Sequence, residues 1–151
     1  MKKIKILLTF LLIFYGCTYE PILSTKKFDF ILEEINHEGE EIVNKIIKNK
    51  LEQRKVGSKN YSINIKSFKN KSIISTDSRG DPTVFEIDIE LNYDLIENNE
   101  VIYRDTIQKQ ITYNNINDKF ELSKYEEGII KNLSNNIGNE ILISISSLSK
   151  W

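Results

Sequence analysis

The stretch from Phe85 to Leu95 alternates strictly between apolar and polar residues. The apolar positions are Phe85, Ile87, Ile89, Leu91, Tyr93 and Leu95, and the polar positions between them are Glu86, Asp88, Glu90, Asn92 and Asp94. Successive side chains of a β-strand point to opposite faces, so this pattern predicts a strand with one dry and one wet face. The chain must therefore build a sheet that is covered on one face only.

Three other segments also have strand patterns. Residues 28–32 alternate around Phe30 and predict a first strand, which ends by Gly39. A second strand is expected from Tyr61 to about Ile74, and a fourth from Val101 to Tyr113. The third and fourth strands are joined by a tight hairpin at 97–100, where two asparagines stand side by side. Loops are expected at 75–82 and 114–119.

Two segments have the periodicity of amphipathic helices. The first runs from 40 to about 55, with apolar positions at Ile42, Val43, Ile46, Ile47 and Leu51. The second runs from about Leu122 to Leu148, with apolar residues at Ile130, Leu133, Ile137, Ile141, Ile145 and Leu148. The order strand-helix-strand-strand-strand-helix predicts an α+β fold: a four-stranded, mainly antiparallel sheet with two helices packed on one face. Residues 28–151 are expected to form this single domain.

The N-terminus has the layout of a bacterial lipoprotein signal. Three lysines precede a short run from Ile6 to Phe14 that is apolar apart from Thr9, and Gly16 stands directly before the only cysteine, Cys17. The run is shorter than the roughly 20 apolar residues of a membrane span. We therefore expect a signal peptide at 1–16, a lipidated Cys17 and a tether over 17–27. The alternative is an ordinary signal peptide with an incidental cysteine.

Charge and cysteine content narrow the function classes. The whole chain carries a formal charge of -1, and loss of the three lysines in residues 1–16 would take the mature chain to -4. Such a domain has no overall basic field for nucleic acid. If Cys17 is acylated, no cysteine remains for a disulfide, so the fold must be stabilised by packing.

The Gly16–Cys17 pair is followed closely by Tyr19 and Pro21. Together with the element order and the size of the mature chain, this resembles the LPS-assembly lipoprotein family, LptE, especially its divergent alphaproteobacterial members. The resemblance covers nearly the whole mature chain. It implies a lipid-anchored, non-catalytic protein on the periplasmic side of the outer membrane, which plugs an LptD-type β-barrel and binds lipopolysaccharide. Thr18 favours the outer membrane, since an aspartate there would favour retention in the inner membrane.

A lipopolysaccharide binder should present cations to the phosphates of the glycolipid. In an antiparallel meander, the loops after the second and fourth strands lie at the same end of the sheet. We therefore expect Lys71, Arg79 and Lys119 to lie near one another and to form a candidate lipopolysaccharide-binding site. The alternative is that these are ordinary solubilising charges.

Other functions remain open. The chain could be a periplasmic lipid- or solute-binding lipoprotein that serves an ABC transporter, which requires an apolar pocket between helices and sheet. A small anchored hydrolase requires a cleft with strongly perturbed carboxyl pKa values. No catalytic motif is present, so we expect no enzyme and no cofactor. His37 is the only histidine, which excludes a two-histidine metal site. The acidic row on the third strand could hold calcium but is better explained as a solvated face.

Overall fold

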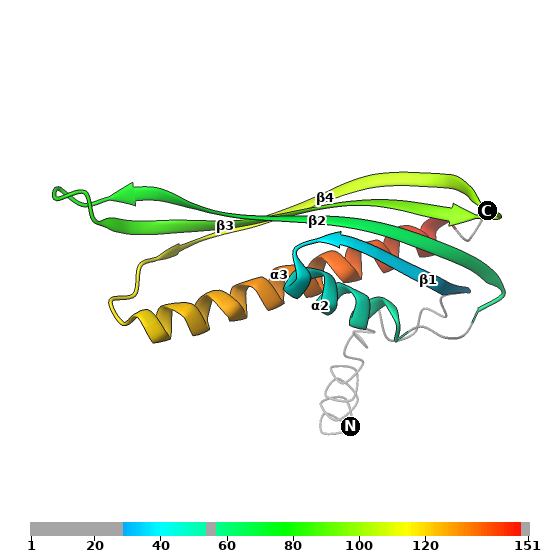
Figure 1. Ribbon diagram of the computed structural model, residues 1–151, viewed down its shortest axis with the longest axis horizontal. Helices are drawn as coiled ribbons and strands as arrows, with labels where there is room; N and C mark the ends of the chain where they lie inside the picture. Colours follow the sequence, from blue (N-terminus) through cyan, green and yellow to red (C-terminus); the bar gives the residue numbers. More distant parts are fainter. Residues whose placement is uncertain (1–28, 54–56, 149–151) are drawn as a thin grey trace, which may run out of the picture.

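The protein folds into two layers, a four-stranded sheet and a pair of helices that cover one of its faces (Figure 1). The computed structural model describes residues 29–53 and 57–148. In chain order the elements are β1 (Phe30–Gly39), α2 (Glu41–Leu51), β2 (Lys59–Thr76), β3 (Pro82–Glu97), β4 (Glu100–Asn114) and α3 (Lys119–Leu148). The expected α+β fold is confirmed. The expected signal peptide, Cys17 and the tether lie outside the described residues.

The strands lie in the order β1-β2-β3-β4. β2, β3 and β4 form an antiparallel meander, and β1 pairs with β2 in parallel. The sheet is therefore mixed, because the connection from β1 to β2 passes through α2 and returns the chain in the same direction.

The alternating pattern of β3 sorts its side chains as predicted. Its apolar residues point toward the helices, and Ile89, Leu91 and Leu95 are fully buried. Burial of such a side chain contributes about 1.5–3 kcal/mol relative to exposure. The helices supply the other half of the core, mainly through Val43, Ile47, Leu51, Ile137, Ile141 and Ile145.

Both helices differ slightly from the sequence prediction. α2 ends at Leu51 instead of about 55, and Ile42 is 58% exposed, because the buried stripe consists of Val43, Ile47 and Leu51 at a spacing of four. α3 begins at Lys119 instead of about Leu122. The carboxylate of Asp118 accepts hydrogen bonds from the backbone N–H groups of Phe120 and Glu121 at 2.8 and 3.1 Å, so Asp118 is the N-cap.

The hairpin between β3 and β4 has the geometry that its two asparagines favour. Asn98 and Asn99 have φ values of 51° and 66°. Two successive left-handed residues are the requirement of a type I′ turn, whose twist matches that of the flanking strands.

The connection from β1 to α2 is packed against β2. Ser67, which is buried, accepts a hydrogen bond at its Oγ from the Glu40 backbone N–H at 3.0 Å. The preceding Gly39 has a φ of +97°, and a Cβ placed there would lie 2.0 Å from the backbone oxygen of Ser67. Glycine is therefore required here by conformation and by space.

Gly39→Ala is expected to lower the free energy of unfolding by about 3 kcal/mol or more, because a left-handed alanine costs about 1–2 kcal/mol and the clash with β2 adds to it. Gly80→Ala is the matched control. Gly80 has a φ of +89°, but a Cβ there meets nothing within 4 Å. Urea denaturation of both variants measures the difference, and equal losses would contradict the steric part of the argument.

The first half of α3 is held to the sheet by a polar cluster around Glu126. Its Oε1 accepts hydrogen bonds from the Tyr113 hydroxyl at 2.8 Å and from the Lys71 ammonium at 2.6 Å. The Lys71 Nζ also lies 4.5 Å from the centroid of the Phe85 ring, which is within cation–π range. Since α2 and β1 do not reach this half of the sheet, the cluster reinforces the contact between the two layers (Figure 1).

Tyr113→Phe is expected to lose about 1 kcal/mol of stability at neutral pH, the value of the lost hydrogen bond. Burial, and then the hydrogen bond and charge of Glu126, raise the pKa of Tyr113 above its ordinary value. Above about pH 10 the folded protein therefore retains the Tyr113 hydroxyl proton, whereas the unfolded chain loses it. The stabilisation is complete below about pH 10 and declines as the pH rises further.

The stability advantage of the wild type over Tyr113→Phe should therefore shrink above about pH 10. Urea unfolding of both proteins at a series of pH values measures this. Because all other tyrosines are shared, their titration cancels in the comparison. A difference that stays constant into the alkaline range would contradict the assignment.

Candidate functional site

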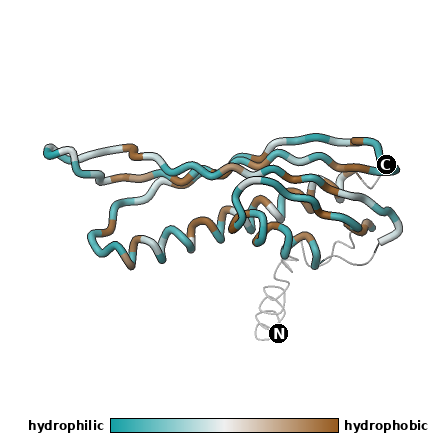
Figure 2. The backbone as a smooth tube through the Cα atoms, viewed as in Figure 1, coloured by the Kyte–Doolittle hydropathy of each residue, from teal (hydrophilic) through white to brown (hydrophobic). Residues whose placement is uncertain are grey.

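The β2–β3 turn and the β4–α3 connection lie at the same end of the molecule, on the left in Figure 1. Asn115 joins them: its backbone N–H donates to the Thr83 oxygen, and its side-chain amide donates to the Pro82 oxygen, both at 2.8 Å. This confirms that the loops after β2 and β4 share one tip of the sheet. Figure 2 shows the β2–β3 turn in hydrophilic colours.

A surface depression of about 410 Å³ lies between these two segments. It is open to solvent, and its lining includes Arg79, Lys119, Asp77, Asp81, Asn115 and Asn117. Two of the three predicted cations, Arg79 and Lys119, therefore line one site. We refer to this depression as the tip site.

Arg79 is held by acids of its own turn. Its guanidinium lies 3.2 Å from the Asp77 carboxylate and 3.5 Å from that of Asp81. Asp77 also accepts backbone hydrogen bonds from Arg79 and Asp81 at 2.8 and 3.0 Å, and these lower its pKa. The Arg79 side chain is nevertheless 79% exposed, so it remains accessible to a ligand.

Lys71 lies apart from the tip site. It stands five residues before the end of β2, a separation of about 17 Å along the strand. Its ammonium is engaged by Glu126 and the Phe85 ring, as described above. The topology argument located the two loop residues but placed Lys71 too near them.

The tip site has balanced charges. The cations Arg79 and Lys119 line the same depression as the carboxylates of Asp77 and Asp81. An anionic ligand must therefore compete with Asp77 and Asp81 for Arg79, whereas Lys119 has no ion pair among the described residues. The sequence signal for this balance was the alternation Asp77, Arg79, Asp81, which the prediction of a cationic tip did not weigh.

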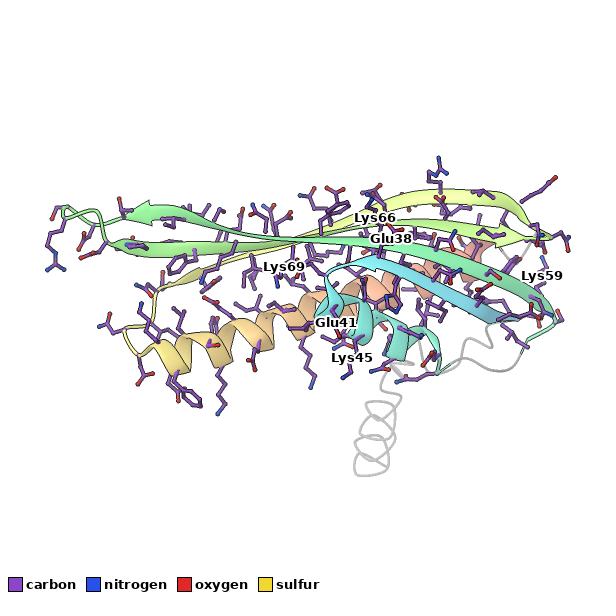
Figure 3. All side chains as sticks on the ribbon, in the orientation of Figure 1. Glu38, Glu41, Lys45, Lys59, Lys66 and Lys69 are labelled. Atoms are coloured by element: carbon purple, nitrogen blue, oxygen red, sulfur yellow. The ribbon has the colours of Figure 1, made fainter. Side chains whose placement is uncertain are left out.

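The second distinctive surface is the face of the sheet opposite the helices, which we call the outer face. Its acids are Glu34, Glu38, Glu86, Asp88, Glu90 and Asp94, and its bases are Lys66 and Arg104. Cross-strand contacts fix many of these side chains. Lys66 lies 3.6 Å from Glu38 on β1 (both are labelled in Figure 3). Arg104 binds Asp94 through two hydrogen bonds of 2.6 and 2.9 Å.

Further cross-strand hydrogen bonds continue this arrangement. The Thr106 hydroxyl donates to Asn92 at 2.6 Å, and Gln108 donates to Asp88 at 2.9 Å. A shallow depression of about 560 Å³ lies over β1, β2 and β3 and is lined by residues that include Asn36, Asn64 and Asp94. The outer face is therefore wet, acid-rich and ordered by its own hydrogen bonds.

The carboxylates of the acidic row on β3 are spread along the strand. Alternate residues of a strand are about 7 Å apart, too far for several carboxylates to meet on one ion. Within residues 29–53 and 57–148, no group of three or more potential ligands is suitably placed to bind a metal.

No helix in the described part of the chain has the length and hydropathy needed to cross a membrane. No protein-family model matches the sequence, and no curated protein matches it either.

Several solved structures nevertheless have a similar fold. Rare lipoprotein B from Shewanella oneidensis is 14% identical with a TM-score of 0.60, and the match covers 77% of this chain and 96% of that one. Lipoprotein B from Nitrosomonas europaea is 14% identical with a TM-score of 0.61, over 82% and 88% of the two chains.

A minor lipoprotein from Acinetobacter baumannii is 8% identical with a TM-score of 0.56, over 81% and 93% of the two chains. At these identities the similarity concerns the fold. The chain thus shares a complete two-layer domain with proteins described as bacterial lipoproteins.

Proposed function

We propose that this chain is an outer-membrane lipoprotein, anchored on the periplasmic side through an acylated Cys17. It assembles with an LptD-type β-barrel, plugs the barrel lumen and takes part in lipopolysaccharide transport to the outer leaflet. In this role it acts as a structural and binding subunit without catalysis.

The observation that carries the proposal is the agreement between fold and N-terminus. The fold matches rare lipoprotein B over 96% of that protein, and rare lipoprotein B belongs to the LptE family that the sequence resembles. Independently, Gly16 and Cys17 follow a short basic and apolar leader, the layout of a lipoprotein signal. Two or three acyl chains on such a cysteine would anchor the domain firmly.

The outer face suits a water-filled lumen. The interior of a large outer-membrane barrel is polar, so a plug needs a rigid surface that stays hydrated. The cross-strand pairs Arg104–Asp94 and Lys66–Glu38 provide that order. The core below the sheet is filled by side chains such as Leu91 and Ile141, which are fully buried. A filled core disfavours the ABC-transporter alternative, which requires an apolar pocket.

A tagged chain extracted from outer membranes in mild detergent is expected to recover a large β-barrel protein in near-equal amount, as identified by mass spectrometry. Reversal of the outer-face charges by Glu86→Lys with Glu90→Lys should lower the recovery several-fold. The matched control is Glu41→Lys with Glu127→Lys, which makes the same charge change on exposed positions of the helix layer. Recovery of ABC-transporter subunits, or of no partner, would contradict the proposal.

The tip site is the proposed contact for lipopolysaccharide phosphates. Arg79→Ala with Lys119→Ala should weaken binding of purified lipopolysaccharide about tenfold, because two charge-assisted contacts are lost. Asp81→Asn should strengthen it about twofold, since Arg79 then has one competitor fewer. Asp81 keeps its backbone hydrogen bond to Asp77 in this variant, so the turn is preserved.

Isothermal titration calorimetry in mild detergent measures these affinities. Lys45→Ala, on the exposed side of α2, is the control for a general loss of positive charge. An equal effect of Lys45→Ala, or weaker binding by Asp81→Asn, would show that the tip site is not the contact.

A further inference from the structure

β4 ends the sheet with a long open edge. It has 15 residues, and its only partner among the described strands is β3. Side chains along it are largely exposed, including Val101 at 51% and Ile111 at 39%. An open edge presents unpaired N–H and C=O groups, which readily accept another strand.

The opposite edge is better protected. β1 is shorter, with 10 residues, and its register with β2 is broken by an irregularity between Leu32 and Glu34. It also carries acids at Glu33, Glu34 and Glu38. Irregular register, short length and one sign of charge all oppose strand addition. β4 is longer and carries both signs of charge, and its register with β3 is regular from Val84–Asn114 to Leu95–Tyr103, with one shift beyond that point, next to the hairpin.

The backbone of β4 has a donor that a side chain occupies. The Thr106 N–H donates to the carboxylate of its neighbour Asp105 at 2.8 Å. A strand carbonyl would be the usual acceptor for such an N–H inside a sheet. At the middle of this edge, the Asp105 carboxylate thus serves as the acceptor that a neighbouring strand would otherwise supply.

The sequence of β4 is complementary to itself when it is read antiparallel about its midpoint, Ile107. In this register Asp105 lies opposite Lys109 of a second copy, and Lys109 opposite Asp105. The other pairs are Thr106 with Gln108, Arg104 with Gln110 and Tyr103 with Ile111. These pairs lie within the regular part of β4, from Tyr103 to Ile111, and no two like charges meet.

Neighbouring registers of the two β4 strands give less favourable charge pairing. Side chains keep to their own face of the sheet only if the register shifts in steps of two residues. If Lys109 instead of Ile107 lies opposite its own copy, two lysines face each other. If Asp105 does, two aspartates face each other. Centres at Thr106 or Gln108 place Asp105 and Lys109 opposite apolar or aromatic residues, so both opposite-charge pairs are lost.

There is room beside this edge on the helix side. Ile111, Tyr125, Gly128 and Ile129 line an open groove of about 410 Å³ between β4 and α3, and a Cβ built on Gly128 meets nothing within 4 Å. Exposed apolar surface along a strand edge is a common mark of an interaction site.

We propose that the β4 edge binds a second copy of this chain, with two β4 strands pairing antiparallel about Ile107 to form one continuous eight-stranded sheet. On pairing, a carbonyl of the second copy replaces Asp105 as acceptor for the Thr106 N–H. Asp105 then faces Lys109 of that copy, and the contact occurs twice because of the two-fold symmetry. This interface is separate from the tip site.

Charge reversal tests the register. Asp105→Lys puts lysine opposite Lys109 twice, and Lys109→Asp puts aspartate opposite Asp105 twice. Each variant alone is expected to dimerise at least tenfold more weakly than the wild type. An equimolar mixture of the two variants restores both opposite-charge contacts in a mixed dimer, so association should recover.

Sedimentation equilibrium of the full chain in a density-matched detergent measures the dimerisation constants. Lys109 also lies 2.6 Å from Glu140 of α3, so Glu140→Gln is the control that changes this internal pair without touching the edge, and it should dimerise like the wild type. Circular dichroism confirms that each variant is folded.

A wild-type chain that stays monomeric at every concentration reached would overturn the proposal, and would leave β4 as an edge for a strand of a different protein. A wild-type dimer that both charge variants still form, or variants whose mixture does not recover, would overturn the proposed register.

Discussion

The packing of β3 against α3 is the contact on which the rest of the structure depends. β3 lies between β2 and β4 and buries Ile89, Leu91 and Leu95 completely, while α3 contributes Ile137 and Ile141 from the facing layer. Without a disulfide among the described residues, this apolar contact must supply most of the stability. It also explains why the polar residues of β3 form an ordered surface: their direction follows from the burial of their neighbours in the sequence.

The charged groups are paired differently on the two surfaces. At the tip, Arg79 is balanced by Asp77 and Asp81 of its own turn. On the outer face, acids outnumber bases, and Glu38, Asp88 and Asp94 are paired with residues of neighbouring strands. Exposed ion pairs contribute little stability, about 0–1 kcal/mol each, so their main effect is to hold side chains in place. Both surfaces thus present fixed polar groups to whatever partner meets them.

The strand and helix order could be predicted because each element carries a strong local pattern. These patterns are the apolar–polar alternation of β3, the Asn98–Asn99 turn and the apolar stripe of α3. Each depends only on residues that are near one another in the sequence, so no long-range information was needed. The tip site was predicted only in part. Arg79 and Lys119 meet because the topology brings two loops together, but Lys71 is drawn to Glu126, a partner 55 residues away that no local pattern reveals. The start of α3 was missed by three residues because the capping role of Asp118 depends on its backbone geometry.

The two sheet edges show how one fold can present different surfaces. β1 is short, irregular and acidic, which protects it from strand addition. β4 is long, has a regular register from Tyr103 to Asn114, and carries Asp105 and Lys109 at equal distances from its midpoint. A protein that only fills a polar space has no need of a regular, self-complementary edge. Such an edge has a cost, since it invites uncontrolled association. The symmetric placement of the opposite charges about Ile107 favours a closed dimer. The two-fold contact occupies the β4 edge of both copies, so no open β4 edge remains to which a third copy could add.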